Sequence, residues 1–183
     1  MLGIVFSEFI EMVEVTFSEE VADEMIEEVE KDLASGGSYT AVGNYDHVEM
    51  LTLVTKLSEI TKVPIPQLVE AYGKHLFGRF HTRYPAFFEG IDNSFDFLQG
   101  IEDRIHSEVR KLYPNSELPG FDLPDSGTER MVMDYSSSRP FAPLAFGLIQ
   151  GCIEHFGEAV EVDWQDLSNG EGTKARFVLS RAA

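Results

Sequence analysis

The stretch MDYSSSRP, Met133–Pro140, places three polar side chains at every second position: Tyr135, Ser137 and Arg139. Side chains along a β-strand alternate between its two faces, so this spacing predicts that the three point to one side of a strand. All three donate hydrogen bonds, and a guanidinium can bind a planar oxyanion through two parallel bonds. The stretch therefore predicts a site for one or two carboxylates held in a fixed orientation. Taken alone, the pattern also fits an ordinary edge-strand face.

The sequence around this stretch predicts helices first and strands later. Apolar residues at helical spacing predict a first helix through Val5, Phe9, Met12 and Val13. Further helices are predicted from Ser18, at 47–60, at 66–80 and at 94–113, the last one stopped by Pro114. PNSELPGFDLPDSG reads as a turn-rich connector and TERMVMDYSSS as a strand. A helix over 141–156, with Gly157 as its C-cap, and a hairpin of two strands around 169–172 follow.

This order of elements predicts an α+β fold in one domain, 1–183. A helical N-terminal subdomain would pack on a C-terminal antiparallel sheet that carries helices of its own. A chain of 183 residues is long enough to enclose a small cofactor.

The charge balance limits the classes of partner. Lys and Arg total 14 against 32 Asp and Glu, a formal net charge of −18. Such a surface repels nucleic acid and anionic lipid, so we expect neither as a partner, whereas a basic face on another protein remains compatible. The N-terminus has no basic leader and no apolar run is long enough for a membrane span, so we expect a cytoplasmic protein.

The motifs of common enzymes are absent from the sequence. It contains no HExxH or CxxC pair, no covalent haem-attachment CxxCH, no P-loop, no GxGxxG after a strand and no nucleophile elbow. The single cysteine, Cys152, excludes an internal disulfide and a zinc site built from several thiolates. His106 has Glu102, Asp103 and Arg110 at helical spacing, which fits either a metal ligand or a surface ion-pair cluster.

Together, the histidine and the alternating motif resemble those of a known family. The spacing from IHSEVRKLYPNSELP to YSSSR is similar to that of the haem-nitric oxide/oxygen binding (H-NOX) family, which is related to the haem domain of soluble guanylate cyclase. GIVFSEFIEMV, LVEAYGKHLF and FGLIQGCIEHFGEAVEV extend the resemblance over nearly the whole chain.

This resemblance implies a fold that encloses a non-covalent b-type haem. His106 would be the proximal iron ligand, and Tyr135, Ser137 and Arg139 would hydrogen-bond the two haem propionates. Pro119 matches a proline that presses on the porphyrin and distorts it. The distal side of the haem would be lined by Val5, Phe9, Leu76, Leu144 and Leu148.

The distal residues imply a choice among gases. Oxygen-binding members carry a tyrosine at the position of Leu144, and here Phe9 and Leu76 also replace polar groups of that network. Bound O2 gains about 1–3 kcal/mol from a desolvated donor, whereas NO bonds strongly to ferrous iron without one. We therefore expect the pocket to select NO, admit CO and bind O2 poorly.

By resemblance the protein is a sensor and not an enzyme. NO binding would release His106 from the iron, and the resulting packing change would be read by a separate signalling histidine kinase or cyclic-di-GMP enzyme. The alternatives are an oxygen sensor or carrier, a haem redox protein, and a haem-free adaptor domain. Whether His75 or His81 ever ligates iron as a second axial group stays open.

Overall fold

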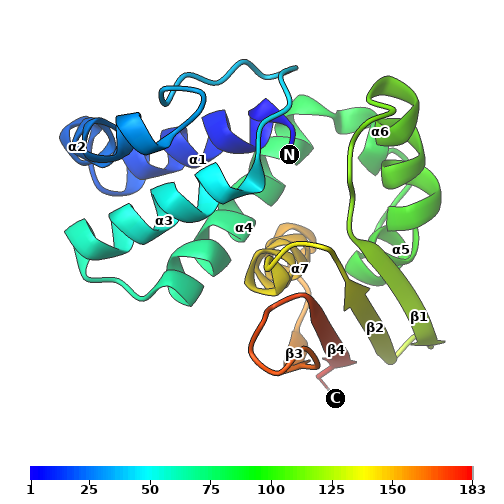
Figure 1. Cartoon of the computed structure of the whole chain (residues 1–183). Helices are drawn as coiled ribbons and strands as arrows, with labels where there is room; N and C mark the ends of the chain where they lie inside the picture. Colours follow the sequence, from blue (N-terminus) through cyan, green and yellow to red (C-terminus); the bar gives the residue numbers. More distant parts are fainter. Residues whose placement is uncertain (183) are drawn as a thin grey trace. The chain divides into compact units, whose positions relative to one another are not determined.

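The computed structural model describes residues 1–182, and these form two compact units that divide between Tyr72 and Gly73 (Figure 1). The division falls inside helix α4 (Ile65–Arg83), whose first part belongs to the first unit and whose second part belongs to the second. The prediction of one domain over 1–183 is not tested by this division and stays a prediction.

The first unit is helical, as the sequence predicted. It contains α1 (Gly3–Thr16), α2 (Glu19–Val29), a 3-10 turn η1 (Glu30–Asp32) and α3 (His47–Thr61). Ser18 caps α2 by accepting a hydrogen bond from the Val21 N–H, and Asp46 caps α3 in the same way. The helices bury a shared apolar core that includes Phe6, Phe9, Met25, Leu53 and Leu57.

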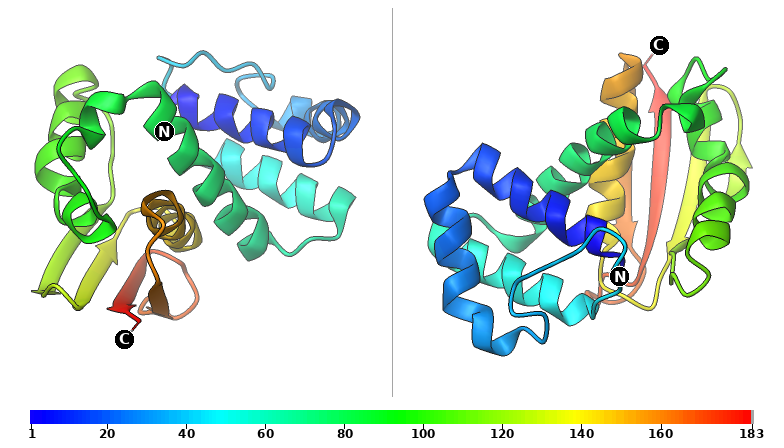
Figure 2. Two further views of the ribbon diagram at one scale, coloured as in Figure 1. Left: turned by 180° about the vertical axis from the view of Figure 1, so that it is seen from behind. Right: turned by 90° about the horizontal axis from the view of Figure 1, so that it is seen from above.

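The second unit combines a sheet with helices (Figure 2). After α4 come a 3-10 turn η2 (Pro85–Phe88), α5 (Ser94–Gln99), a π-helical segment η3 (Ile101–His106) and α6 (Ser107–Leu112). The rest of the chain forms β1 (Gly120–Ser126), β2 (Arg130–Ser136), α7 (Ala142–Phe156), β3 (Val160–Asp166) and β4 (Lys174–Arg181). The four strands form an antiparallel sheet in the order β1-β2-β4-β3.

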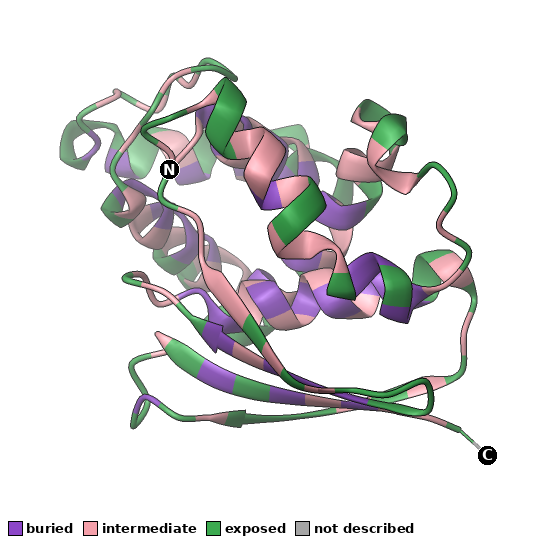
Figure 3. Cartoon of the chain, turned by 90° about the vertical axis from the view of Figure 1, so that its right-hand side faces the viewer, coloured by how far each residue is buried: buried purple, intermediate pink, exposed green. Residues whose placement is uncertain are grey.

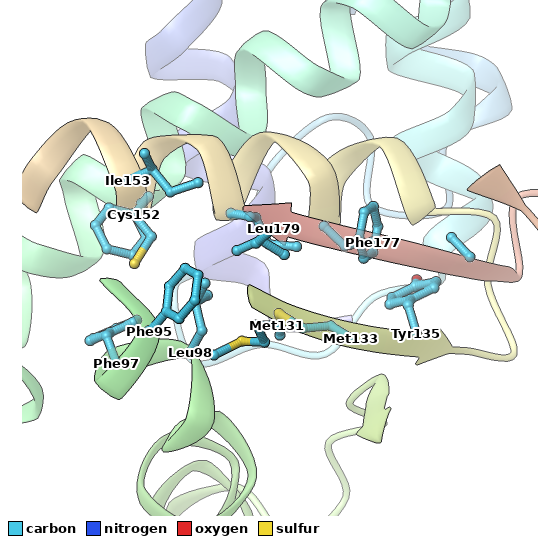
Figure 4. Packing of buried hydrophobic residues seen from close by; sticks show 14 of the residues in the cluster. Phe95, Phe97, Leu98, Met131, Met133, Tyr135, Cys152, Ile153, Phe177 and Leu179 are labelled. Carbon is cyan, nitrogen blue, oxygen red and sulfur yellow. The ribbon is translucent and has the colours of Figure 1, made fainter. Parts of the chain in front are cut away.

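Alternating side chains give this sheet one apolar face. Met131, Met133 and Tyr135 of β2 pair with Leu179, Phe177 and Ala175 of β4, and all six residues are buried. Figure 3 shows buried stretches of ribbon both in the strands and in the helices. The six residues meet apolar residues of α5 and α7, among them Phe95, Phe97, Leu98, Cys152 and Ile153 (Figure 4). This apolar core fixes the position of β2, and with it Tyr135, against α5 and α7.

Glycines let α7 lie very close to the second part of α4. A Cβ atom on Gly73 would lie 2.5 Å from the Leu144 carbonyl oxygen and 2.8 Å from the Gly147 Cα. A Cβ on Gly151 would lie 2.9 Å from the Phe77 Cβ. Because real Cβ atoms do not approach other atoms so closely, these positions require glycine for this helix crossing.

The predicted connector before β2 is partly wrong. Gly120–Ser126 forms the edge strand β1, paired with β2 from Gly120↔Ser136 to Ser126↔Met131. Its register shifts between Asp122 and Asp125, which places Pro124 at a bulge. A residue at a bulge is not paired in the ladder, so the lack of an N–H in proline costs no hydrogen bond there. The prolines suggested a loop because a proline signal does not separate a loop from a bulged edge strand.

The predicted helix over 94–113 is also not continuous. It consists of α5, η3 and α6, and within η3 the backbone follows the wider π spacing: the Ser107 N–H donates to the Glu102 carbonyl five residues earlier. A π segment inside a helix leaves the apolar spacing nearly unchanged, so periodicity alone does not reveal it.

A half-buried carboxylate, that of Glu158, connects α5 to β4. Glu158 accepts hydrogen bonds from the Ser94 N–H at 2.7 Å and from Arg181 Nη1 at 2.6 Å, and the Arg181 guanidinium lies 4.6 Å from the Phe95 ring centre. Burial alone would raise the pKa of Glu158, but these hydrogen bonds outweigh it and hold the pKa below its ordinary value.

No helix within residues 1–182 is both long and apolar enough to cross a membrane.

Replacing the Glu158 carboxylate should weaken the fold in a pH-dependent way. We expect Glu158→Gln to lower the free energy of unfolding by about 1–2 kcal/mol at pH 7. Because the folded pKa is lowered, the contribution is complete above the ordinary glutamate pKa of about 4.3 and is lost as the pH falls below it. Urea unfolding at pH 7 and pH 3 checks this, with the exposed Glu161→Gln as control. An equal difference from wild type at both pH values would contradict it.

Candidate functional site

His106 is a buried imidazole at the end of the π segment. It is the last residue of η3, and only 8% of the residue is exposed. Burial lowers the pKa of His106, so the ring is neutral at neutral pH, which is the form that binds a metal ion. The predicted contacts of His106 and Arg110 with Glu102 are present, but His106 is buried and not at the surface.

Glu102 fixes the orientation of this imidazole. Its Oε1 accepts a hydrogen bond from His106 Nδ1 at 3.0 Å and another from the Phe121 N–H of β1 at 3.1 Å, while Arg110 Nη2 donates to Oε2 at 3.2 Å. Burial alone would raise the pKa of Glu102, but these partners outweigh it and lower the pKa. Because an ionised carboxylate only accepts, His106 carries its proton on Nδ1 and leaves Nε2 as the available metal-binding atom.

The structure brings His106 and the Tyr135 motif together through Phe121. The Phe121 ring centre lies 6.2 Å from that of His106 and 5.6 Å from that of Tyr135, and Phe121 is the register partner of Tyr135 in the sheet. Burial raises the pKa of Tyr135, so its hydroxyl stays protonated and can donate.

The alternating motif is strand and turn, not strand throughout. Strand β2 ends at Ser136, and Ser137 Oγ accepts a hydrogen bond from the Arg139 N–H at 3.1 Å, which bends the chain after Tyr135. The prediction that all three side chains alternate along one strand is therefore wrong for Ser137 and Arg139, which lie beyond the end of β2. The Ser137 hydroxyl stabilises the turn by a hydrogen bond within three residues. The alternation of polar and apolar residues does not distinguish such a turn from a longer strand.

Arg139 presents a guanidinium with one unused buried donor. Its side chain is 14% exposed, Nη2 lies 2.7 Å from Glu117 Oε2, and Nη1 donates to the Glu117 carbonyl at 3.3 Å. Its Nε atom is buried and has no hydrogen-bond acceptor among residues 1–182. A buried donor of this kind is costly unless it meets an acceptor, so the residue fits the carboxylate of a haem propionate.

Pro119 lies between two anchored residues. Glu117 precedes it and contacts Arg139, and Phe121 follows it and donates to Glu102. Pro119 itself is half-buried just before β1. This arrangement holds the segment in place from both sides, which is what a proline pressing on a flat cofactor requires; that role stays a prediction.

The predicted distal residues divide between the two units. Val5 and Phe9 lie on α1 of the first unit, where Phe9 packs edge-on against Tyr72 with ring centres 5.2 Å apart. Leu76 on α4 and Leu144 and Leu148 on α7 lie in the second unit, and Leu76 is buried. Their common role as the lining of a gas-binding pocket stays a prediction.

The two histidines left open by the sequence lie on α4. The His81 ring centre is 4.1 Å from that of His155 on α7, within a group of phenylalanine rings that includes Phe88. His81 is therefore surrounded by aromatic rings of the second unit. The sequence left open whether it is a second axial ligand of iron. The structure does not decide whether His75 or His81 ever ligates a metal.

Two site residues had weak or absent signals in the sequence. Glu102 was visible only as the helical neighbour of His106, a spacing that surface ion pairs share. Glu117 had no signal, because its partner Arg139 is 22 residues away and reaches it only through the sheet. Contacts between distant segments depend on strand pairing, which local spacing does not encode.

Known proteins of one family are similar to this chain over nearly its whole length. The family model described as Haem-NO-binding (HNOB) matches residues 2–164. An Fe(II) unliganded H-NOX protein from K. algicida is 34% identical, with a TM-score of 0.92, over 100% of this chain and 97% of that chain. An IWP-051-bound H-NOX from Shewanella woodyi in the Fe(II)CO state is 40% identical, with a TM-score of 0.83, covering 100% and 95%. No curated protein sequence matches the chain.

A third solved structure, an H-NOX protein from S. oneidensis in the Fe(II)NO state, is 25% identical, with a TM-score of 0.87 and full coverage of both chains. The α+β fold and the family match define a haem-binding gas-sensor domain, which is not catalytic by itself. The chain belongs to the H-NOX family.

The Glu102 contact predicts a measurable effect on haem binding. We expect Glu102→Leu to weaken haem affinity by about tenfold, as loss of a group that orients a metal ligand generally does. The iron–histidine stretching frequency of the ferrous protein should also fall, because His106 becomes a weaker base. Haem titration and resonance Raman spectra check this, with the exposed neighbour Asp103→Asn as control. Unchanged values in Glu102→Leu would contradict the assignment.

Proposed function

We propose that this protein is a nitric oxide sensor that carries a b-type haem and signals to a separate partner protein. The observation that supports it most is His106, a buried neutral imidazole whose Nδ1 is held by Glu102 and whose Nε2 is left for iron. The family match supports the haem, and the absence of a CxxCH motif from the sequence supports a non-covalent, b-type one. When bound, haem supplies a ferrous iron that binds diatomic gases.

Three residues would hold the edge of the haem. Tyr135 keeps its phenol proton because it is buried, Arg139 has its buried Nε donor without a protein acceptor, and Ser137 sets the turn between them. In a protein of net charge −18, a cation at the propionates offsets a local repulsion that the rest of the chain would increase.

The choice of NO over O2 is supported by the lack of a free hydrogen-bond donor at the residues considered for the gas-binding side. Leu144 and Leu76 carry no donor, and Tyr72, the tyrosine closest to Leu76 on α4, donates its hydroxyl to the Val5 carbonyl. Burial raises the pKa of Tyr72, so it keeps this proton. An oxygen carrier needs a donor at the bound gas, and Tyr72 is already used within the first unit.

His106 is positioned to convert its release into movement. When NO binds, we propose that His106 leaves the iron while its Nδ1 keeps the Glu102 hydrogen bond. Glu102 also binds Phe121, so displacement of η3 reaches β1 and the segment of Pro119. A π segment returns to α-helical spacing when it shifts by one residue, and we propose that η3 switches between these two arrangements.

The partner we propose is a signalling histidine kinase or a cyclic-di-GMP enzyme, by family resemblance. The exposed side of α2 carries Glu19, Glu20, Asp23, Glu24, Glu27 and Glu28. We place docking of a basic partner face there, and a complex whose affinity does not fall as salt rises would contradict this.

Removal of the iron ligand tests the proposal directly. We expect His106→Gly to lose haem, and free imidazole to restore both the haem and the ferrous spectrum. Absorbance spectra of the reduced protein with NO, CO and air check this. Haem retained with an unchanged NO spectrum would contradict the ligand assignment. Steady peroxide turnover, or a six-coordinate low-spin ferrous spectrum, would favour a redox protein, and no Soret band after haem supply would favour an adaptor.

A hydroxyl at position 144 should change gas selectivity. We expect Leu144→Tyr to increase O2 affinity by about 5- to 150-fold, because a desolvated donor is worth roughly 1–3 kcal/mol to bound O2. Leu144→Phe is the matched control, since it adds the ring without the hydroxyl. Oxygen titration of the ferrous protein measures the difference between the two. A wild-type protein that already forms a stable oxy spectrum in air would favour the oxygen-sensor alternative.

A further inference from the structure

We propose that Glu117 competes with a haem propionate for Arg139 and so sets how readily the protein exchanges its haem. This inference rests on the proposed role of Arg139 at the propionates. It concerns a residue outside the motif, on the segment between α6 and β1.

The contact is between one guanidinium and one residue of the same chain. Glu117 Oε2 lies 2.7 Å from Arg139 Nη2, and the Glu117 carbonyl accepts from Nη1 at 3.3 Å. Both terminal nitrogens therefore face Glu117, and only the buried Nε has no acceptor. A propionate that binds Arg139 either takes the Nη2 edge from Glu117 or shares the guanidinium with it.

Both arrangements weaken the propionate contact. If the propionate takes the Nη2 edge, the ion pair between Arg139 and Glu117 is lost. If the guanidinium is shared, the two carboxylates repel each other, since one unit of positive charge then faces two of negative charge. The Arg139 side chain is only 14% exposed, so water screens this repulsion incompletely. A negative charge at position 117 therefore weakens the hold of the protein on the propionate.

The exposure of Glu117 makes the competition reversible. Its side chain is 69% exposed, so the carboxylate returns to water at little cost when a propionate displaces it. A buried carboxylate would resist displacement, and an unpaired buried arginine would be costly in the absence of any anion. Glu117 thus serves as a replaceable partner for Arg139.

A purely orienting role for Glu117 predicts the opposite sign. If Glu117 only holds Arg139 in place, its removal loosens the guanidinium and the protein loses haem faster. If Glu117 competes, its removal leaves Arg139 to the propionate and the protein loses haem more slowly. The direction of one rate therefore separates the two roles.

The experiment measures transfer of haem from the holoprotein to an excess of a haem-free globin, followed by absorbance. We expect Glu117→Gln to slow haem loss by about two- to fivefold, the range of an exposed ion pair, and the difference from wild type to shrink at high salt. Glu108→Gln is the matched control, because it removes one charge from the ion pair that Glu108 forms with Lys111 on α6. An unchanged or faster rate in Glu117→Gln would overturn the proposal.

The variant Arg139→Gln keeps this test separate from the assignment beneath it. Faster haem loss in Arg139→Gln, together with no effect of Glu117→Gln, would reject the competition and leave the propionate role of Arg139 intact. No effect of Arg139→Gln would reject both. In the double variant Glu117→Gln with Arg139→Gln, competition predicts that the Glu117 change no longer slows haem loss.

Discussion

The rest of the site depends on one half-buried carboxylate, that of Glu102. It joins the π segment to the edge of the sheet, because its Oε1 accepts from both His106 and Phe121 and its Oε2 accepts from Arg110. An ionised carboxylate in a half-buried place must keep its donors, since each lost hydrogen bond leaves charge uncompensated. The orientation of the imidazole and the position of β1 are therefore set by the same group, so a change at one reaches the other.

The sheet and α7 give this group a rigid frame. The register of β2 with β4 buries Met131, Met133 and Tyr135 on the face that the helices cover, and the glycines of α4 and α7 allow a crossing that larger residues would prevent. A close-packed core of this kind changes between discrete arrangements and does not deform smoothly. It suits a sensor whose output is a switch in packing, which is the role we propose for this member of the H-NOX family.

The local charge at the proposed haem site is opposite in sign to the net charge of the protein. The chain carries a net charge of −18, yet the site we assign to the propionates is built on Arg139. The same arginine contacts Glu117, an acidic residue of the same chain that is far more exposed than its partner. Short-range contacts in a poorly screened place outweigh the average charge of the surface, so composition does not reveal how firmly the cofactor is held.

The sequence by itself determined most helices, the cap at Ser18, and the hairpin around Asn169–Gly170, because these depend on neighbours within a few residues. The family resemblance located His106 and the Tyr135 motif, since their spacing is specific. Only the tertiary structure decided that Gly120–Ser126 is a strand, that the helix before it contains a π segment, and that Glu102 and Glu117 contact His106 and Arg139. These features depend on contacts between segments that are distant in the chain, and the local sequence pattern of one segment does not indicate which other segment it will contact.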